Sequence, residues 1–139
     1  MALVPFGIFA ICEIIFFGSS TLVHRCQIEF KQADYWTLFL IAPLSEELFF
    51  RGLLLHALLT RYSKSWAIVI SSILFMLAHG IWAFGPLSLG LIAGWMALKF
   101  RSIVPGIIFH TISNAYMPAL CKWFPGSYDF ISKLPILVK

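Results

Sequence analysis

Charged residues are scarce in this sequence, and their scarcity restricts the class of protein that it can encode. Of the 139 residues, 12% are charged and 60% are hydrophobic, and the mean hydropathy is +0.91. Soluble domains are about 25% charged and about 45–50% apolar. A soluble domain of this size would bury only about 65–70% of its unfolded surface, so large apolar patches would face water. The composition therefore predicts an integral membrane protein in contact with the lipid bilayer.

Paired cysteines and basic clusters are also lacking. The three cysteines have neither CxxC spacing nor the Cys/His spacing of a metal site, so no disulfide framework is expected. The ten Lys and Arg residues give a net charge of +4 but stand singly or in pairs, and no nucleic-acid partner is expected. The N-terminus has no basic region or small-residue cleavage site. We therefore expect the first apolar run to be retained as a span.

Five apolar segments are candidates to cross a bilayer, which takes about 20 helical residues. They cover residues 2–23, 36–60, 65–82, 86–98 and 105–123. The fourth is short for a crossing and could instead be a buried helix. No repeat, linker or low-complexity tract divides the chain. We predict one membrane-embedded domain over residues 1–139, with an all-α fold that is a polytopic transmembrane bundle of four to five segments. Its location would be the plasma membrane if the chain is bacterial.

Prolines and glycines predict local features of these helices. Pro43 lacks an N–H, and its ring clashes with the carbonyl of Phe39, so the second segment is expected to kink or restart there. Pro118 predicts a similar interruption of the fifth segment. Gly90 and Gly94 have the GxxxG spacing that lets another helix approach closely, although such pairs also occur by chance in apolar helices.

Three ionisable residues lie within the second segment, in the stretch SEELFFRG. A charge at membrane depth costs at least about 2.5–3.5 kcal/mol and persists mainly in a protein interior or a functional pathway. Glu47 and Arg51 are four residues apart and can pair, whereas Glu46 points about 100° away. We expect Arg51 to keep Glu47 ionised and Glu46 to be free for general-base chemistry. A purely structural ion pair is the alternative, but three buried charges are costly for structure alone.

Two histidines and an asparagine lie in later segments. His79 lies near the end of the third segment, while His110 and Asn114 share one face of the fifth. Alone, His79 would more often be interfacial, and the other two could form an interhelical hydrogen-bond site. Helical rise places Glu46 and Asn114 about 12–16 Å from the membrane face on which the second segment begins, with His79 shallower. All therefore lie in the same half of the bilayer, where a kinked second segment could open a water-filled pocket.

In combination, these residues resemble the family of CAAX-type intramembrane endopeptidases, which includes the CAAX prenyl protease and the bacterial bacteriocin-immunity and abortive-infection proteins. The family pattern has three motifs, EExxxR, FxxxH and HxxxN or HxxxD, matched here by Glu46, Glu47 and Arg51, by Phe75 and His79, and by His110 and Asn114. Each motif alone is weak. All three in order, each within an apolar helical segment, are specific, and they cover roughly residues 36–122.

The resemblance implies a membrane protease that hydrolyses peptide bonds of membrane-associated substrates, with prenylated CAAX-type chains as one substrate class. Carried over, Glu46 is the general base, His79 orients or polarises the water, and His110 with Asn114 stabilises the oxyanion, with Glu47 and Arg51 completing the catalytic set. The resemblance leaves open whether the cofactor is none or one divalent metal such as zinc. If a metal is used, its ligands would be Glu46, His79 and His110, since the HExxH pattern is absent.

Two other readings compete with proteolysis. One is a non-catalytic membrane protein of the same fold, such as an immunity factor that binds a toxin or receptor, although the intact motifs favour the enzyme. The other is a small proton-coupled carrier, which would need a path open to both sides of the membrane. Glu13, His24 and His56 stand outside the motifs, and we expect no catalytic role for them. Family members usually have more spans before the first motif than the single one found here.

Overall fold

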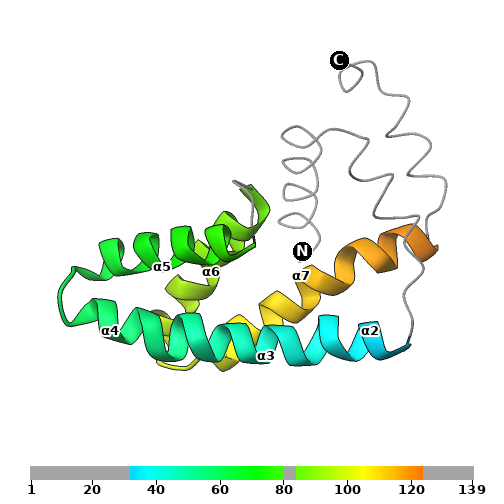
Figure 1. Cartoon of the computed structure of the whole chain (residues 1–139), viewed down its shortest axis with the longest axis horizontal. Helices are drawn as coiled ribbons and strands as arrows, with labels where there is room; N and C mark the ends of the chain where they lie inside the picture. The colour runs from blue at the N-terminus through cyan, green and yellow to red at the C-terminus, as the bar shows by residue number, and fades with distance from the viewer. Residues whose placement is uncertain (1–31, 80–83, 124–139) are drawn as a thin grey trace, which may run out of the picture. The chain divides into compact units, whose positions relative to one another are not determined.

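The second apolar segment forms one continuous helical stretch in the computed structural model, which describes residues 32–79 and 84–123 (Figure 1). The stretch consists of α2 (Gln32–Trp36), η1 (Thr37–Ile41), α3 (Ala42–Glu47), η2 (Leu48–Leu54) and α4 (Leu55–Leu59). The two η elements are π-helical, a wider helix that is rare in proteins and is often found at functional sites. The segment predicted over residues 36–60 is therefore helical throughout, and α3 lies between the two π-helical elements.

Pro43 does not interrupt this helix in the way the sequence predicted. Ile41 and Ala42 keep right-handed helical backbone angles, and the Ala42 N–H bonds the carbonyl of Thr37, five residues back. The π-helical turn immediately before Pro43 widens the backbone, so the chain accommodates the ring without restarting the helix. Of the two outcomes expected at Pro43, a restart is not observed, and the distortion there takes the form of a wider turn.

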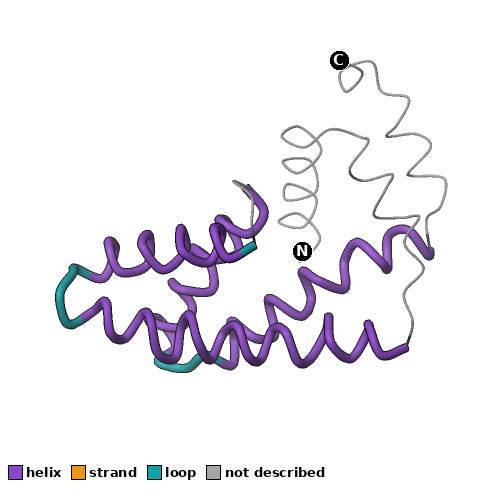
Figure 2. The backbone as a smooth tube through the Cα atoms, in the orientation of Figure 1, coloured by secondary structure: helices purple, strands orange, loops and turns teal. Residues whose placement is uncertain are grey.

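Three further helices follow, α5 (Lys64–Ala78), α6 (Phe84–Phe100) and α7 (Val104–Trp123). Figure 2 shows tight connections at residues 60–63 and 101–103. These helices correspond to the third, fourth and fifth predicted segments, with α6 somewhat longer than expected. Pro118 lies inside α7 without ending it, so the predicted interruption there is not observed. The first predicted segment lies outside the described residues.

The glycine pair of α6 packs closely against α5. A Cβ atom added at Gly90 would lie 2.9 Å from the Cβ of Ser72, and one added at Gly94 would lie 3.1 Å from Cγ2 of Ile68. A helix can approach this closely only where a side chain is missing. The prediction that this face receives another helix is confirmed, and α5 is that helix.

Two clusters of buried apolar side chains join the helices of the compact unit Gln32–Asn114. One contains Phe50, Phe75 and Leu89, with Leu54 and Phe109 packed against it; the other contains Leu55, Ala67 and Ala97. The first cluster brings together η2, α5, α6 and α7 beside the charged residues described below. Its packing fixes how the motif-bearing helices face one another.

All regular structure within the described ranges is helical, which confirms the all-α class. In the same ranges, no single helix combines the length and the hydropathy needed to cross a membrane. The transmembrane arrangement, the number of spans and the single domain over residues 1–139 stay predictions.

Candidate active site

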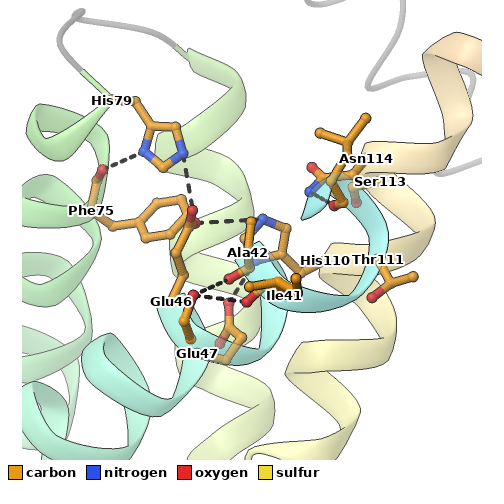
Figure 3. A network of polar contacts seen from close by, with 12 residues as sticks. Ile41, Ala42, Glu46, Glu47, Phe75, His79, His110, Thr111, Ser113 and Asn114 are labelled. Atoms are coloured by element: carbon orange, nitrogen blue, oxygen red, sulfur yellow. Dashed lines mark hydrogen bonds and ion pairs between the residues drawn. The ribbon is translucent and has the colours of Figure 1, made fainter. Parts of the chain in front are cut away.

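Glu46 lies between the two motif histidines. Its Oε2 atom is 3.7 Å from Nε2 of His79 and 3.8 Å from Nε2 of His110. Figure 3 shows both rings directed at this carboxylate, one from the C-terminal end of α5 and the other from α7. Both distances exceed that of a direct hydrogen bond, and Oε2 is buried without a hydrogen-bond partner among the described residues. The oxygen can therefore take a proton from a third group held between the rings.

Each histidine is oriented by a hydrogen bond at its other ring nitrogen. Nδ1 of His79 lies 2.8 Å from the carbonyl oxygen of Phe75, and Nδ1 of His110 lies 3.1 Å from Oε1 of Glu47. A carbonyl or carboxylate oxygen can only accept, so both Nδ1 atoms carry the hydrogen. In the neutral form of each ring, Nε2 then presents its lone pair toward Glu46.

Glu47 is buried beside both Arg51 and His110. Its Oε1 atom lies 3.1 Å from Nη1 of Arg51, and the two side chains are 0% and 1% exposed. The pairing of Glu47 with Arg51 agrees with the prediction from their i,i+4 spacing. The same oxygen also accepts the hydrogen bond from His110, a contact that the sequence did not suggest. Glu47 therefore links the ion pair to one of the two histidines.

Arg51 is held by charge and by an aromatic face. Its Cζ atom lies 4.5 Å from the ring centroid of Phe75, a distance typical of a cation–π contact. None of its guanidinium nitrogens makes a hydrogen bond within the described residues. The removal of Glu47 would therefore leave a buried cation without its paired carboxylate, a costly state.

Phe75, the phenylalanine of the FxxxH motif, contacts both histidines of the site as well as Arg51. Its centroid lies 4.5 Å from that of His79, 5.7 Å from that of His110 and 5.0 Å from that of Phe50. The ring is 1% exposed. This buried ring therefore packs against both Arg51 and the two histidines.

Asn114 lies one turn beyond His110 on α7, and its amide is engaged with the backbone of η1. Its Nδ2 atom donates to the carbonyl oxygen of Leu38 across 2.9 Å. The amide has two hydrogens, and this contact uses one of them. Neighbouring Thr111 donates to the carbonyl oxygen of Phe39, also across 2.9 Å.

The histidines and acidic residues of the site fit a metal ion only in part. Within the described ranges, no group of three or more His, Cys, Asp and Glu residues is arranged to hold a metal ion. The three residues expected as ligands if a metal is used, Glu46, His79 and His110, nevertheless lie together around Oε2 of Glu46. Two tetrahedral ligands with bonds of about 2.0–2.1 Å would lie about 3.4 Å apart, somewhat closer than the 3.7 and 3.8 Å observed.

The structure thus brings together five of the six predicted site residues, and it places Asn114 one helical turn away. Sequence reasoning missed three contributors: Ser71, Thr111 and Gly106. A Cβ at Gly106 would lie 3.1 Å from Oε2 of Glu47, so the absent side chain makes room for that carboxylate. Pro43 could have pointed to Thr111, because a proline has no N–H to donate to the carbonyl of Phe39. Thr111 donates to that carbonyl instead. No sequence signal identifies Ser71 or Gly106.

His56 lies away from the cluster. Its Nδ1 atom donates to the carbonyl oxygen of Arg51 across 2.8 Å, which caps a backbone group of the π-helical element η2. The expectation of no catalytic role for His56 stays a prediction. Glu13 and His24 lie outside the described residues.

Comparison with known proteins identifies the family. The family described as type II CAAX prenyl endopeptidase Rce1-like matches residues 30–116, well over half of the chain and all three motifs. No curated protein and no solved structure matches the chain. The family is membrane-embedded, and membership in it implies proteolysis of the CAAX type. The resemblance noted from the motifs is confirmed, and the chain belongs to the type II CAAX prenyl endopeptidase Rce1-like family.

Proposed function

We propose that this chain is an intramembrane endopeptidase that hydrolyses a peptide bond next to a prenylated cysteine in membrane-associated CAAX-type substrates. The observation that carries the proposal is the position of Glu46, whose Oε2 faces Nε2 of both His79 and His110. A carboxylate flanked by two histidine nitrogens can bind and deprotonate a water molecule, which is the first requirement of peptide hydrolysis without a protein nucleophile.

In this mechanism Glu46 is the general base. Its Oε2 takes a proton from a water molecule, whose oxygen then attacks the carbonyl carbon of the scissile bond. The lone pair on Nε2 of His79 accepts a hydrogen bond from the same water and orients it, because the opposite ring nitrogen is fixed on the Phe75 carbonyl. The proton held by Glu46 next moves to the leaving amine as the C–N bond breaks, so protons balance over the cycle.

The oxyanion formed by this attack requires hydrogen-bond donors. The second hydrogen of the Asn114 amide is one candidate, because only the first is used on Leu38. Nε2 of His110 is the other when the ring carries two protons. Glu47 holds the ring in place for this contact, since its carboxylate accepts the hydrogen bond from Nδ1 of His110. We assign oxyanion stabilisation to these two residues.

Membrane integration is part of the proposal. Large apolar side chains are exposed along the helical stretch that carries the glutamates, among them Trp36, Leu40, Leu44, Leu48 and Leu53. An apolar surface of this extent is unfavourable in water, and lipid is the solvent that fits it. We expect the expressed protein to stay in the pellet after extraction of membranes with alkaline carbonate. Release into the supernatant would contradict this part of the proposal.

Cleavage of a defined peptide tests the function. The probe is a peptide with a farnesylated cysteine four residues from its C-terminus, incubated with purified protein in detergent and analysed by mass spectrometry. The proposal predicts release of the C-terminal tripeptide by the wild-type protein and none by Glu46→Gln. The same peptide without the farnesyl group is the control for prenyl recognition. Absence of cleavage by the folded wild-type protein would contradict the proposal.

A further inference from the structure

The segment that carries both glutamates is bounded on each side by π-helical backbone. Element α3 follows η1 and precedes η2 without a break. π-helical turns are rare, and sparsely populated backbone persists where the surrounding structure holds it. The contacts that other helices make with the carbonyls of η1 and η2 therefore decide how α3 is placed.

On the N-terminal side, these contacts come from the helix that carries His110. Pro43 has no N–H to donate to a carbonyl. In an α-helix this N–H would bond the carbonyl of Phe39, and in a π-helix that of Leu38. Thr111 and Asn114 of α7 donate to these two carbonyls, each across 2.9 Å. Thr111 is adjacent to His110 in the chain, so this bond fixes α7 against η1 directly beside the ring that faces Glu46.

On the C-terminal side, the contact comes from the helix that carries His79. The hydroxyl of Ser71, which is 2% exposed, donates to the carbonyl oxygen of Phe50 across 3.1 Å. Phe50 belongs to η2, three residues after Glu47. Ser71 lies two turns before His79 in α5, so this bond fixes α5 against η2.

Each histidine-bearing helix therefore donates one hydroxyl to the backbone on one side of the glutamate segment. We propose that Thr111 and Ser71 are positioning residues, which set the placement of α3 so that Nε2 of both histidines faces Oε2 of Glu46. The proposal rests on the proposed function for its kinetic consequence. Neither hydroxyl touches the reacting atoms. Loss of either bond lets α3 rotate or slide relative to one histidine, and a displacement of about 1 Å can cost about 100-fold in rate.

Matched serines in the same helices provide controls. Ser113 of α7 and Ser72 of α5 each donate to a carbonyl of their own helix, four residues back, and do not bond the glutamate-bearing stretch. The test pairs are therefore Thr111→Val with Ser113→Ala, and Ser71→Ala with Ser72→Ala. Thr111→Ser keeps the hydroxyl and is the conservative variant that should restore activity. If Thr111→Val fails to fold, the activity of Thr111→Ser still tests the proposal.

The kinetic arm measures kcat and KM for the farnesylated CAAX peptide in detergent. Thr111→Val and Ser71→Ala should each lower kcat by about tenfold or more, with KM within about twofold of wild type, because the bonds align groups that act on the bound substrate. Thr111→Ser should restore most of kcat, and the two control variants should stay close to wild type. Equal losses of kcat in the test and control variants would overturn the proposal.

A spectroscopic arm tests the positioning separately from the function. The chain has four histidines, and the ring signals of His110 in ¹⁵N-histidine-labelled protein can be assigned by their loss in His110→Gln. Thr111→Val should shift the Nδ1 signal of His110, because the bond to Glu47 depends on the placement of α7, and Ser113→Ala should leave it unchanged. If wild-type protein fails to cleave the peptide while these shifts appear, the proposed function fails and the positioning holds. Identical spectra for Thr111→Val and wild type would overturn the positioning.

Discussion

His110 donates the hydrogen of its Nδ1 to Oε1 of Glu47 across 3.1 Å, and both side chains are almost completely buried. The same glutamate oxygen pairs with Arg51. Glu47 thus has two tasks that mutagenesis can separate: it neutralises a buried cation, and it orients a histidine of the candidate active site. The adjacent Glu46 pairs with neither Arg51 nor Nδ1 of His110. Its carboxylate faces Nε2 of His79 and of His110 instead.

Glu47→Gln should destabilise the protein. The substitution leaves Arg51 buried without a counter-ion, a change that typically costs about 3–5 kcal/mol. We expect low expression or a clearly lower midpoint of thermal unfolding in detergent. Arg51→Gln introduced in the same chain should restore part of the loss, because it removes the unpaired charge. A single Glu47→Gln variant as stable as wild type would show that the pair does not support the fold.

The double variant Glu47→Gln with Arg51→Gln should regain stability without regaining activity. Glutamine can still accept the hydrogen bond from His110, but a neutral amide oxygen is a weaker acceptor than a carboxylate and holds the ring less firmly. We expect kcat at least about tenfold below wild type, since removal of one oxyanion donor typically costs about 10²–10³-fold. Peptide cleavage and thermal unfolding of the same preparation are the measurements. Recovery of both properties would limit Glu47 to a structural role.

Gly106→Ala should disturb the carboxylate of Glu47 from the opposite helix. The new Cβ would lie 3.1 Å from Oε2 of Glu47 and 3.6 Å from the Cβ of Ala93, so the glutamate must move. Overpacking of this kind costs about 1–3 kcal/mol, and we expect both the unfolding midpoint and kcat to fall. The control is Gly52→Ala, whose Cβ would meet its nearest neighbour at an ordinary 3.9 Å. Equal behaviour of the two variants would contradict the close packing at Gly106.

The contact between α5 and α6 predicts an order of stability for two alanine variants. At Gly90 a Cβ would meet both Cβ and the backbone Cα of Ser72, at 2.9 and 3.0 Å, whereas at Gly94 it would meet side-chain atoms of Ile68. A side chain can move away more easily than a backbone. Gly90→Ala should therefore lower the unfolding midpoint more than Gly94→Ala, with a cost of about 1–3 kcal/mol. The reverse order would contradict the observed packing.

The helical class, the helix positions and the motif residues followed from composition and spacing, because apolar runs and i,i+4 pairs depend on local sequence. The contact between Glu47 and His110 did not, since it joins residues 63 positions apart and depends on how α7 rotates against α3. The π-helical turn before Pro43 was also missed. The sequence shows that Phe39 loses a donor there, but it does not show that Thr111 and Asn114 of another helix donate to the carbonyls of Phe39 and Leu38.

Metal dependence can be decided by chelation. The separations of 3.7 and 3.8 Å between the candidate ligand atoms exceed the roughly 3.4 Å expected for a tetrahedral zinc site, and His110 is better used with Asn114 at the oxyanion. We therefore expect purified protein to keep its activity after treatment with a chelator and dialysis. Loss of activity that zinc restores, with about one metal equivalent bound, would instead assign Glu46, His79 and His110 as ligands.

The most direct test of the account is the turnover of Glu46→Gln on the farnesylated CAAX peptide, measured beside its unfolding midpoint. Glutamine keeps the shape and hydrogen bonding of the side chain but cannot take a proton from water. Turnover should fall by at least the roughly 10²–10⁴-fold that acid–base catalysis supplies. The unfolding midpoint should stay near that of wild type, since Glu46 has no part in the buried pair of Glu47 and Arg51. Retained proteolysis, or destabilisation as large as that of Glu47→Gln, would contradict the assignment of Glu46 as the general base.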